Sequence, residues 1–307
     1  MVSLESSLNR TGLLWLGLLL VLLTMTGGVD ARDMEKCTRC HDETEKYPVL
    51  SILQTKHATQ ADPRSPMGSE GCETCHGVAD DHLRPPAEGE KRIPPPVVFG
   101  HGEMPAEQQN QVCLQCHESG DRTHWRGSVH EFQEVACVSC HDIHTPQDPV
   151  LVKQSQAAVC VNCHAEKRAE MLKPSSHPVY EGKMACTDCH NPHGSMGDHL
   201  LREPTLAETC YTCHAEKRGP FLWEHAPARE DCSVCHQPHG SIHASLLHTR
   251  GPWLCQQCHL GSHSSAAFDG TAVPPQGARV QVIGKSCLNC HSQVHGSNSP
   301  LGAGFTR

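Results

Sequence analysis

The stretch CVNCHAEKRAEMLKPSSHPVYEGKMACTDCHNPHGS, at residues 160–195, decides the fold. It contains two Cys-x-x-Cys-His motifs, one histidine between them, and one histidine three residues after the second motif. Nearly the same order returns in CYTCHAEKRGPFLWEHAPAREDCSVCHQPHGS at residues 210–241, with AEKR and PHGS unchanged. Self-similarity at a nearly fixed spacing is the signature of a repeat architecture. We therefore expect a chain built from two-motif modules.

Ten Cys-x-x-Cys-His motifs use all 20 cysteines of the 307-residue chain. Two cysteines separated by two residues lie on one side of a helical turn and can form thioethers with the vinyl groups of one porphyrin, and the adjoining histidine can bind the iron. The sequence therefore predicts ten covalently attached c-type haems. The expected thioether residues are Cys37, Cys40, Cys72, Cys75, Cys113, Cys116, Cys137, Cys140, Cys160, Cys163, Cys186, Cys189, Cys210, Cys213, Cys232, Cys235, Cys255, Cys258, Cys287 and Cys290. The expected proximal iron ligands are His41, His76, His117, His141, His164, His190, His214, His236, His259 and His291.

Two other uses of cysteine fit this pattern less well. Ten disulfides in an exported protein would use every cysteine but would leave the ten adjoining histidines unexplained. Zinc sites would need the Cys-x-x-Cys units to pair with each other or with histidines at ribbon or finger spacings, without a histidine after each unit. Covalent haem accounts for both residue types.

Each predicted module also supplies two further histidines, one between its motifs and one after the second motif. The three middle copies keep this arrangement closely, and the outer copies keep its order. Ten spare histidines for ten haems is what bis-histidine ligation throughout would require. The predicted distal ligands are His57, His82, His130, His144, His177, His193, His225, His239, His263 and His295.

Five histidines fall outside the repeat and are interpreted as surface or propionate-contacting groups, because a solvated histidine is commoner than a ligand. They are His101, His124, His199, His243 and His248. For each predicted distal ligand, the alternative interpretation is likewise a surface histidine. The order of residues does not say which distal histidine serves which haem.

The composition agrees with an interior filled by cofactors. Aromatic residues make up only 4%, while the chain has 25 Gly and 22 Pro. A chain so poor in large apolar side chains cannot offset the entropy of ordering by side-chain burial alone. Strand signals are nearly absent, and segments such as 161–172 are rich in helix formers. We expect a multihaem cytochrome c fold of short α-helices and coil with almost no β structure, forming an elongated stack of haems from five two-haem modules.

The first 31 residues resemble an export signal. An apolar run from Gly12 to Met25 is shorter than the roughly 20 residues that span a bilayer. Val29-Asp30-Ala31 then offers small residues at the usual cleavage positions. We expect cleavage after Ala31, with retention as an anchor as the alternative, and a decahaem cytochrome domain over residues 32–307. Its modules are expected at about 37–84, 113–146, 160–195, 210–241 and 255–297.

The net charge of −9 gives no sign of a nucleic-acid partner. Redox proteins or cations are the expected partners.

With the modules in view, the chain resembles the MtrA/DmsE family of periplasmic decahaem cytochromes over roughly residues 37–297. The most specific strings are SSHP at 175–178, CTDCHNPHGSM at 186–196, CYTCHAEKRGPFLWEHAP at 210–227, LCQQCH at 254–259 and SCLNCHSQVHGSN at 286–298. The resemblance implies a mostly helical and coil fold with stacked haems and the same ten distal histidines. It also implies a periplasmic protein held against the outer membrane by a β-barrel partner of the MtrB type. Other implied partners are periplasmic carriers or an inner-membrane quinol cytochrome, and an extracellular multihaem cytochrome.

Two functions from different classes remain. The first is an electron conduit without substrate chemistry, because full bis-histidine ligation leaves no open iron position. The second is a multihaem reductase of the nitrite or hydroxylamine type, which needs an open haem, often with Lys replacing the motif histidine. No motif carries that replacement, so we predict an electron-transfer protein and not an enzyme. The terminal partner stays open among metal-oxide reduction, dimethyl sulfoxide respiration and Fe(II) oxidation.

Overall fold

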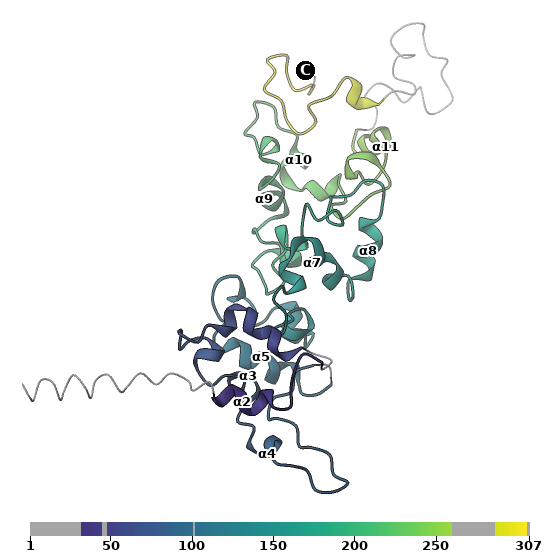
Figure 1. Ribbon diagram of the computed structural model, residues 1–307. Helices are drawn as coiled ribbons and strands as arrows, with labels where there is room; N and C mark the ends of the chain where they lie inside the picture. The colour runs from purple at the N-terminus through teal and green to yellow at the C-terminus, as the bar shows by residue number, and fades with distance from the viewer. Residues whose placement is uncertain (1–31, 45–47, 101, 260–285, 306–307) are drawn as a thin grey trace, which may run out of the picture. The chain divides into compact units, whose positions relative to one another are not determined.

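The computed structural model describes residues 32–44, 48–100, 102–259 and 286–305. Within these ranges the chain forms short helices joined by turns and coil, with no strand and only isolated β-bridges (Figure 1). The fold class predicted from the sequence is therefore confirmed. The predicted export signal at residues 1–31, His101 and the predicted distal ligand His263 lie outside the described residues.

The helices are short, and the longest described one has nine residues. The α-helices are α2 (Arg32–Thr38), α3 (Glu73–His76), α4 (Asp80–Leu83), α5 (Ala106–Leu114), α6 (Val129–Phe132), α7 (Lys153–Cys160), α8 (Ala165–Met171), α9 (Leu206–Tyr211), α10 (Ala226–Glu230) and α11 (Gly251–Gln256). The 3₁₀-helices are η1 (Val49–Gln54), η2 (Lys56–Ala58), η3 (Pro66–Gly68), η4 (Gly120–Arg122), η5 (Cys137–Ser139), η6 (Pro149–Leu151), η7 (Cys186–Asp188), η8 (Asp198–Leu200), η9 (Ala215–Lys217), η10 (Cys232–Val234), η11 (Ala244–Leu246) and η13 (Cys287–Asn289). None of the helices in the described ranges has the length and apolar character that a membrane span requires.

The motifs sit on helical turns, as their spacing predicts. In nine of the ten, the histidine N–H donates to the carbonyl of the first cysteine, at 2.9–3.1 Å. The first motif of each predicted module begins at or near the C-terminal end of an α-helix, namely α2, α5, α7, α9 or α11. The second motif lies on a single 3₁₀ turn in four modules and on α3 in the first. One helical turn thus presents both cysteines and the histidine to the same side of the backbone.

The side chains of the described residues form only a small apolar core. Its members are Ile52, Met67, Ala79, Leu114, Trp125, Ala136, Val150, Ala157, Met171, Ala185, Leu201 and Ala207. Five of these are alanines, which bury little apolar area each. This agrees with the expectation that side-chain burial contributes little to the stability of this chain.

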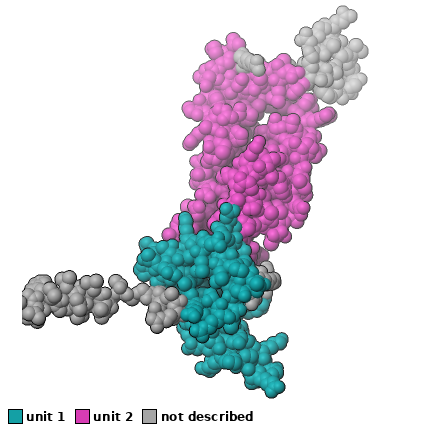
Figure 2. Space-filling model, viewed as in Figure 1, with its two compact units in different colours: residues 1–116, 142–147 teal, residues 117–141, 148–307 magenta. Residues whose placement is uncertain are grey.

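The contacts divide the chain into two compact units (Figure 2). Unit 1 comprises residues 1–116 and 142–147, and unit 2 comprises residues 117–141 and 148–307. In unit 1, Lys36 near the end of α2 donates to Glu73 at the start of α3 at 2.8 Å. This hydrogen bond is the main cause that lowers the pKa of the Glu73 carboxyl. The ion pair links the regions of the first two motifs.

In unit 2, segments from successive predicted modules meet as short backbone bridges. Ser175 and Ser241 exchange two N–H···O bonds of 3.0 and 2.7 Å, and Trp223 and Ser297 exchange two of 2.9 Å. Ser241 is 1% exposed. Both bridges join the segment before a second motif to the His-Gly-Ser string of the next module. The repeated string is therefore a docking element between repeats.

The glycine of each His-Gly-Ser string lies against the preceding module. A Cβ added at Gly194 would overlap the carbonyl oxygen of His124, and one at Gly240 would overlap that of Glu170. A Cβ at Gly296 would overlap the ring of Phe221. All three glycines have positive φ, of +108°, +151° and +137°. Only glycine allows this close approach without displacing a neighbour.

Gly240→Ala should destabilise the contact between the third and fourth modules, because the added methyl group meets a backbone carbonyl that cannot rotate away. Overpacking of this kind costs about 1–3 kcal/mol. The matched control is Gly127→Ala, since Gly127 also has positive φ but has nothing within 4 Å of an added Cβ. Thermal unfolding of the holoproteins checks the difference. Equal losses of Tm in the two variants would contradict the steric account.

Candidate haem sites

Eight histidine pairs hold their imidazole rings at nearly the same separation. Their ring centroids lie 6.0–6.4 Å apart. Every pair joins the histidine of a Cys-x-x-Cys-His motif to one of the predicted distal histidines. The pairs, motif histidine first, are His41–His82, His76–His144, His141–His193, His164–His130, His190–His239, His214–His177, His236–His295 and His259–His225.

This separation fits one metal ion between two imidazole nitrogens. Two metal–nitrogen bonds of about 2 Å, plus about 1 Å from each nitrogen to its ring centroid, give about 6 Å. The angles between the ring planes run from 10° to 78°, yet the distance hardly changes. Rings in direct contact would change their separation with that angle. A bridging atom therefore explains the constancy better than ring packing does.

Backbone carbonyls orient many of these rings. The Nδ1–H donates to a carbonyl oxygen at 2.7–3.1 Å in seven paired histidines. They are His76, His82, His130, His177, His190, His225 and His236. Because a carbonyl can only accept, the proton must reside on Nδ1, and Nε2 keeps its lone pair for a metal.

Three of these carbonyls belong to the residue just before a His-Gly-Ser string. His130 donates to Pro192 at 2.7 Å, His177 to Pro238 at 2.8 Å, and His225 to Val294 at 2.9 Å. Each bond runs from the first distal histidine of one predicted module to the backbone beside the second distal histidine of the next. One turn of chain thus positions two candidate ligands at each contact between modules.

Burial also favours the neutral, metal-binding form of these imidazole rings. Loss of hydration lowers the pKa of seven of the predicted ligands, because a charged ring is disfavoured where water is excluded. These are His57, His76, His144, His190, His193, His239 and His295. An imidazole must be neutral to bind a metal, so this shift favours the ligating form.

Cysteines of several neighbouring motifs lie close together, and none of the 20 forms a disulfide. The thiol of Cys160 donates to Cys186, which raises the pKa of Cys160 and lowers the pKa of Cys186 to about 7. Cys210 and Cys232 are related in the same way. Each pair consists of the first cysteines of the two motifs of one module. Burial, reinforced by the facing cysteine, likewise raises the pKa of Cys37 beside Cys72 and of Cys255 beside Cys287 to about 11.

The second cysteines make the complementary contacts, between modules. Cys140 lies near Cys163, Cys189 near Cys213, and Cys235 near Cys258, and burial is the main cause that raises the pKa of the first member of each pair. From the fourth motif to the tenth, motifs that follow one another in sequence are therefore neighbours in space, alternately through their second and their first cysteines.

The donor set fits a porphyrin better than a bare metal ion. Among the described residues, no group of three or more His, Cys, Asp or Glu side chains is placed to hold a metal. Two histidines supply two ligands, and a porphyrin supplies the four in-plane nitrogens that complete an octahedral iron site. Buried donors beside one pair also lack acceptors in the protein, namely Arg122 Nε, Trp125 Nε1 and His193 Nδ1. Haem propionates are acceptors of the kind such donors require.

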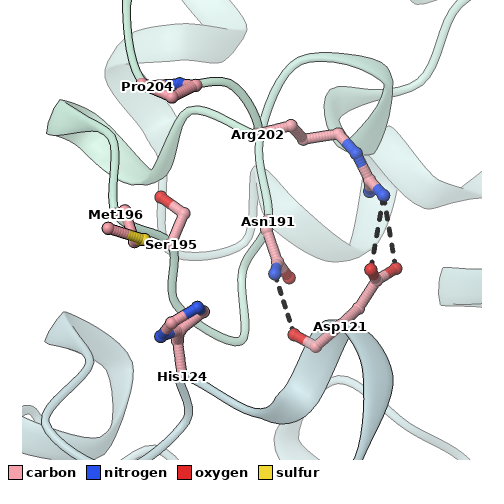
Figure 3. Close-up of a pocket in the computed structure, with 7 residues that line it drawn as sticks. All are labelled: Asp121, His124, Asn191, Ser195, Met196, Arg202 and Pro204. Carbon is pink, nitrogen blue, oxygen red and sulfur yellow. Dashed lines mark hydrogen bonds and ion pairs between the residues drawn. The ribbon is translucent and has the colours of Figure 1, made fainter.

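A pocket in unit 2 lies where the second predicted module meets the third (Figure 3). Figure 3 shows Asn191 and Arg202 directed at Asp121, to which they are bonded at 2.8 Å and 3.3 Å. These polar groups satisfy one another, and the arrangement holds no nucleophile paired with a base. We interpret this pocket as part of the contact between modules. His124, which the sequence placed outside the ligand set, lines the pocket and is in none of the eight pairs.

The other predicted ligands are placed as follows. His57 is half-buried in unit 1, and His117 belongs to unit 2. His291 donates its Nδ1–H to the carbonyl of Gly304. Of the histidines outside the repeat, His248 bonds through its ring to Gln237 and Ser233, and the carbonyl of His199 accepts from His190.

Sequence reasoning missed the groups that orient the ligands. Most are backbone carbonyls, which carry no residue-type signal beyond the proline of the Pro-His-Gly-Ser strings. The closest carboxylate is that of Asp148, which accepts from Nδ1 of His141 at 2.6 Å. Its position seven residues after a motif histidine was visible, but nothing in the repeat singled it out.

Known proteins similar to this chain are multihaem cytochromes. Residues 72–158 match the family described as cytochrome c-type protein NrfB-like, and residues 177–219 and 225–262 match the doubled CXXCH motif. The multiheme cytochrome MtrA of Shewanella baltica is 46% identical over 280 residues, which cover 90% of this chain and 82% of that protein. The cytochrome c-type protein NrfB of Escherichia coli O6:H1 is 30% identical over 148 residues, covering 47% of this chain and 72% of that one. NrfB of Haemophilus influenzae is 26% identical over 148 residues, covering 43% and 65%.

The doubled-motif matches agree with the observed pairs. The first match begins at His177 and includes its partner His214. The second begins at His225 and includes its partner His259. Each match thus runs from a first distal histidine to the motif histidine that it faces.

His225→Met should raise the reduction potential of one haem and leave the others unchanged, because thioether ligation stabilises the reduced iron relative to a second imidazole. His243→Met is the matched control, since His243 belongs to none of the eight pairs. A spectroscopically monitored redox titration of the two holoproteins makes the comparison. If the His225 variant titrates like the unmodified protein, His225 is not a ligand.

Proposed function

Because the chain belongs to the MtrA family of multihaem c-type cytochromes, we propose that it is an electron conduit in which ten c-haems carry electrons along the chain without substrate chemistry. The observation that supports this most directly is the set of eight imidazole pairs at 6.0–6.4 Å. In this proposal the 20 cysteines form the thioethers, and the ten motif histidines and ten distal histidines named from the sequence bind the irons.

The ligands cross between modules in a regular way. The first motif histidine of a module takes the first distal histidine of the preceding module, as in His164–His130 and His214–His177. The second motif histidine takes the second distal histidine of the following module, as in His190–His239. Seven of the eight pairs follow this rule, and His41–His82 closes within the first module. In this scheme the three contacts from the second module to the fifth are each held by iron ligation in both directions.

The haem supplies one-electron exchange between ferric and ferrous iron without making or breaking a bond. The protein's own groups do the rest. The paired imidazoles would hold the iron from two sides and would leave oxygen, nitrite and other small ligands no open site. Carbonyls such as those of Val97 and Ser245 fix the ring orientation through Nδ1. From the fourth motif on, the alternating cysteine contacts bring successive attachment sites close together, so the path of electrons would follow the order of the motifs there.

The runner-up function is a multihaem reductase. It would need one iron with an open axial position, and the eight observed pairs leave little room for one. Eight of the ten motif histidines face a predicted distal histidine. The conduit is therefore favoured because paired ligation accounts for nearly all motifs.

We place the mature protein in the periplasm, associated with the outer membrane through a β-barrel protein of the MtrB type. The predicted export signal and the specific strings shared with the MtrA/DmsE family support this location. The donors would be periplasmic carriers or an inner-membrane quinol cytochrome, and the partner on the far side an extracellular multihaem cytochrome or a terminal substrate. The same chain of haems could serve metal-oxide reduction, dimethyl sulfoxide respiration or Fe(II) oxidation, because the direction of electron flow follows the potentials of donor and acceptor.

The holoprotein should show only low-spin haem. Electron paramagnetic resonance and optical spectra should contain no high-spin signal at the level of one haem per chain, and carbon monoxide should not bind the reduced protein. The physical reason is that both axial positions are filled by imidazole. A stoichiometric high-spin haem would favour the reductase.

The barrel partner is tested by purification. The holoprotein, tagged at its C-terminus and extracted from membranes in mild detergent, should co-purify with an outer-membrane β-barrel protein. An unrelated tagged periplasmic cytochrome, carried through the same steps, is the control. Recovery of the whole holoprotein from the periplasmic fraction, with no barrel attached, would exclude the proposed location.

A further inference from the structure

One motif histidine differs from its equivalents in what its Nδ1–H meets. In His190 and His236, the second motif histidines of the third and fourth modules, Nδ1–H donates to backbone carbonyls nine residues downstream, at 2.9 and 2.8 Å. Their equivalent in the second module, His141, donates instead to the Asp148 carboxylate at 2.6 Å. His76 and His291, the second motif histidines of the first and fifth modules, also donate to carbonyls, so this position in the repeat carries a neutral acceptor four times and a charged acceptor once.

The local structure holds Asp148 firmly in this position. Its side chain is only 10% exposed, and its other oxygen, Oδ1, accepts from the backbone N–H of Val150 at 3.3 Å, which caps η6. The turn is anchored in addition by Gln156, whose amide donates to the carbonyl of Val150 at 2.8 Å. The carboxylate therefore cannot easily rotate away from His141.

The other carboxylates near motif or distal histidines are weaker cases. Glu170 lies 3.3 Å from Nδ1 of His239, but Lys167 also contacts it at 3.0 Å, and this offsets its charge. Glu216 lies 3.9 Å from Nδ1 of His214, beyond hydrogen-bond distance. Among the described residues, Asp148 makes the shortest carboxylate–imidazole contact that the geometry offers.

A carboxylate draws the Nδ1 proton more strongly than a carbonyl does and leaves the ring more electron-rich at Nε2. Added negative charge near an iron stabilises its ferric state over its ferrous state, because reduction removes one positive charge from the metal. Burial strengthens the effect, since a charge shielded from water is screened less.

We propose that Asp148 is a positioning residue that lowers the reduction potential of the iron held by His141 and His193 below that of the irons held at His190 and His236. The proposal rests on the proposed function, because it takes the His141–His193 pair as iron ligands. The step concerned is the gain of one electron by ferric iron, with no change in its ligands and no proton transferred.

This assignment has a consequence for conduction. The motif that contains His141 is the fourth of ten, and its Cys140 lies near Cys163 of the fifth motif. Asp148 would make the iron at this motif less willing to hold an electron than the irons held at His190 and His236. A single side chain would then set a difference in electron energy between sites that have the same two ligands.

Asp148→Asn tests the proposal with little change of shape. Asparagine can still cap η6 and still accept from Nδ1 of His141, but it carries no charge, like the carbonyls in the third and fourth modules. In a redox titration of the holoprotein, one component should move to a more positive potential while the others stay in place. Asp148→Glu, which keeps the charge, should restore part of the original potential.

Asp198→Asn is the matched control. Asp198 stands at nearly the same place after His190, but the acceptor of that ring is the carbonyl of His199. Removing this charge should leave the titration nearly unchanged. His193→Met, made as a separate single variant, identifies the haem concerned. It should shift the same component of the redox titration that Asp148→Asn shifts.

The possible outcomes distinguish an error in the role of Asp148 from an error in the ligand assignment. If Asp148→Asn keeps every haem low-spin and titrates like the unmodified protein, the role of Asp148 is wrong while the conduit stands. If His193→Met does not move any component, or the unmodified protein contains high-spin haem, the ligand assignment on which the proposal rests is wrong instead.

Discussion

A nearly constant gap of 6.0–6.4 Å between paired imidazole rings is the constraint that the rest of the structure serves. A metal–ligand bond tolerates little error, so each ring must be held in both position and tilt. Long helices are not needed for this, because one helical turn fixes a motif and one carbonyl fixes a ring. That is why a chain of short helices and turns, with a small apolar core, can carry so many equivalent sites.

The crossing of ligands between modules explains why the repeats meet so closely. In ordinary repeat proteins, neighbours stack by burying apolar faces. Here the faces are poor in large apolar side chains, and the close contacts are backbone bridges such as Ser175 with Ser241, together with a glycine that allows the chains to touch. Iron held between two modules would supply the cohesion that side-chain burial does not. The predicted ligand, the glycine and the bridging serine lie together in the three-residue His-Gly-Ser string, at one contact between modules.

Much of this could be predicted from the sequence, for physical reasons that differ by feature. The Cys-x-x-Cys-His spacing encodes its own geometry, so the helical turn at each motif was expected and is found. The distal histidines followed from the repeat, and eight of them face a motif histidine. Their partners could not be predicted, because the paired residues lie in different modules and depend on how the modules dock. The carbonyls that orient the rings were equally hidden, since a backbone oxygen looks the same at every residue.

Identical ligands do not have to give identical sites. Every observed pair is histidine with histidine, so irons bound there could differ through what the far side of each ring touches. Backbone carbonyls would give these irons similar reduction potentials, because the carbonyls are neutral and are fixed by the fold. Side chains such as Asp148 and Glu170 can change the potential at one site without changing the two ligands there. A repeat protein can therefore keep its architecture constant while the energy of an electron varies along its length, and that variation is encoded outside the motifs that define the family.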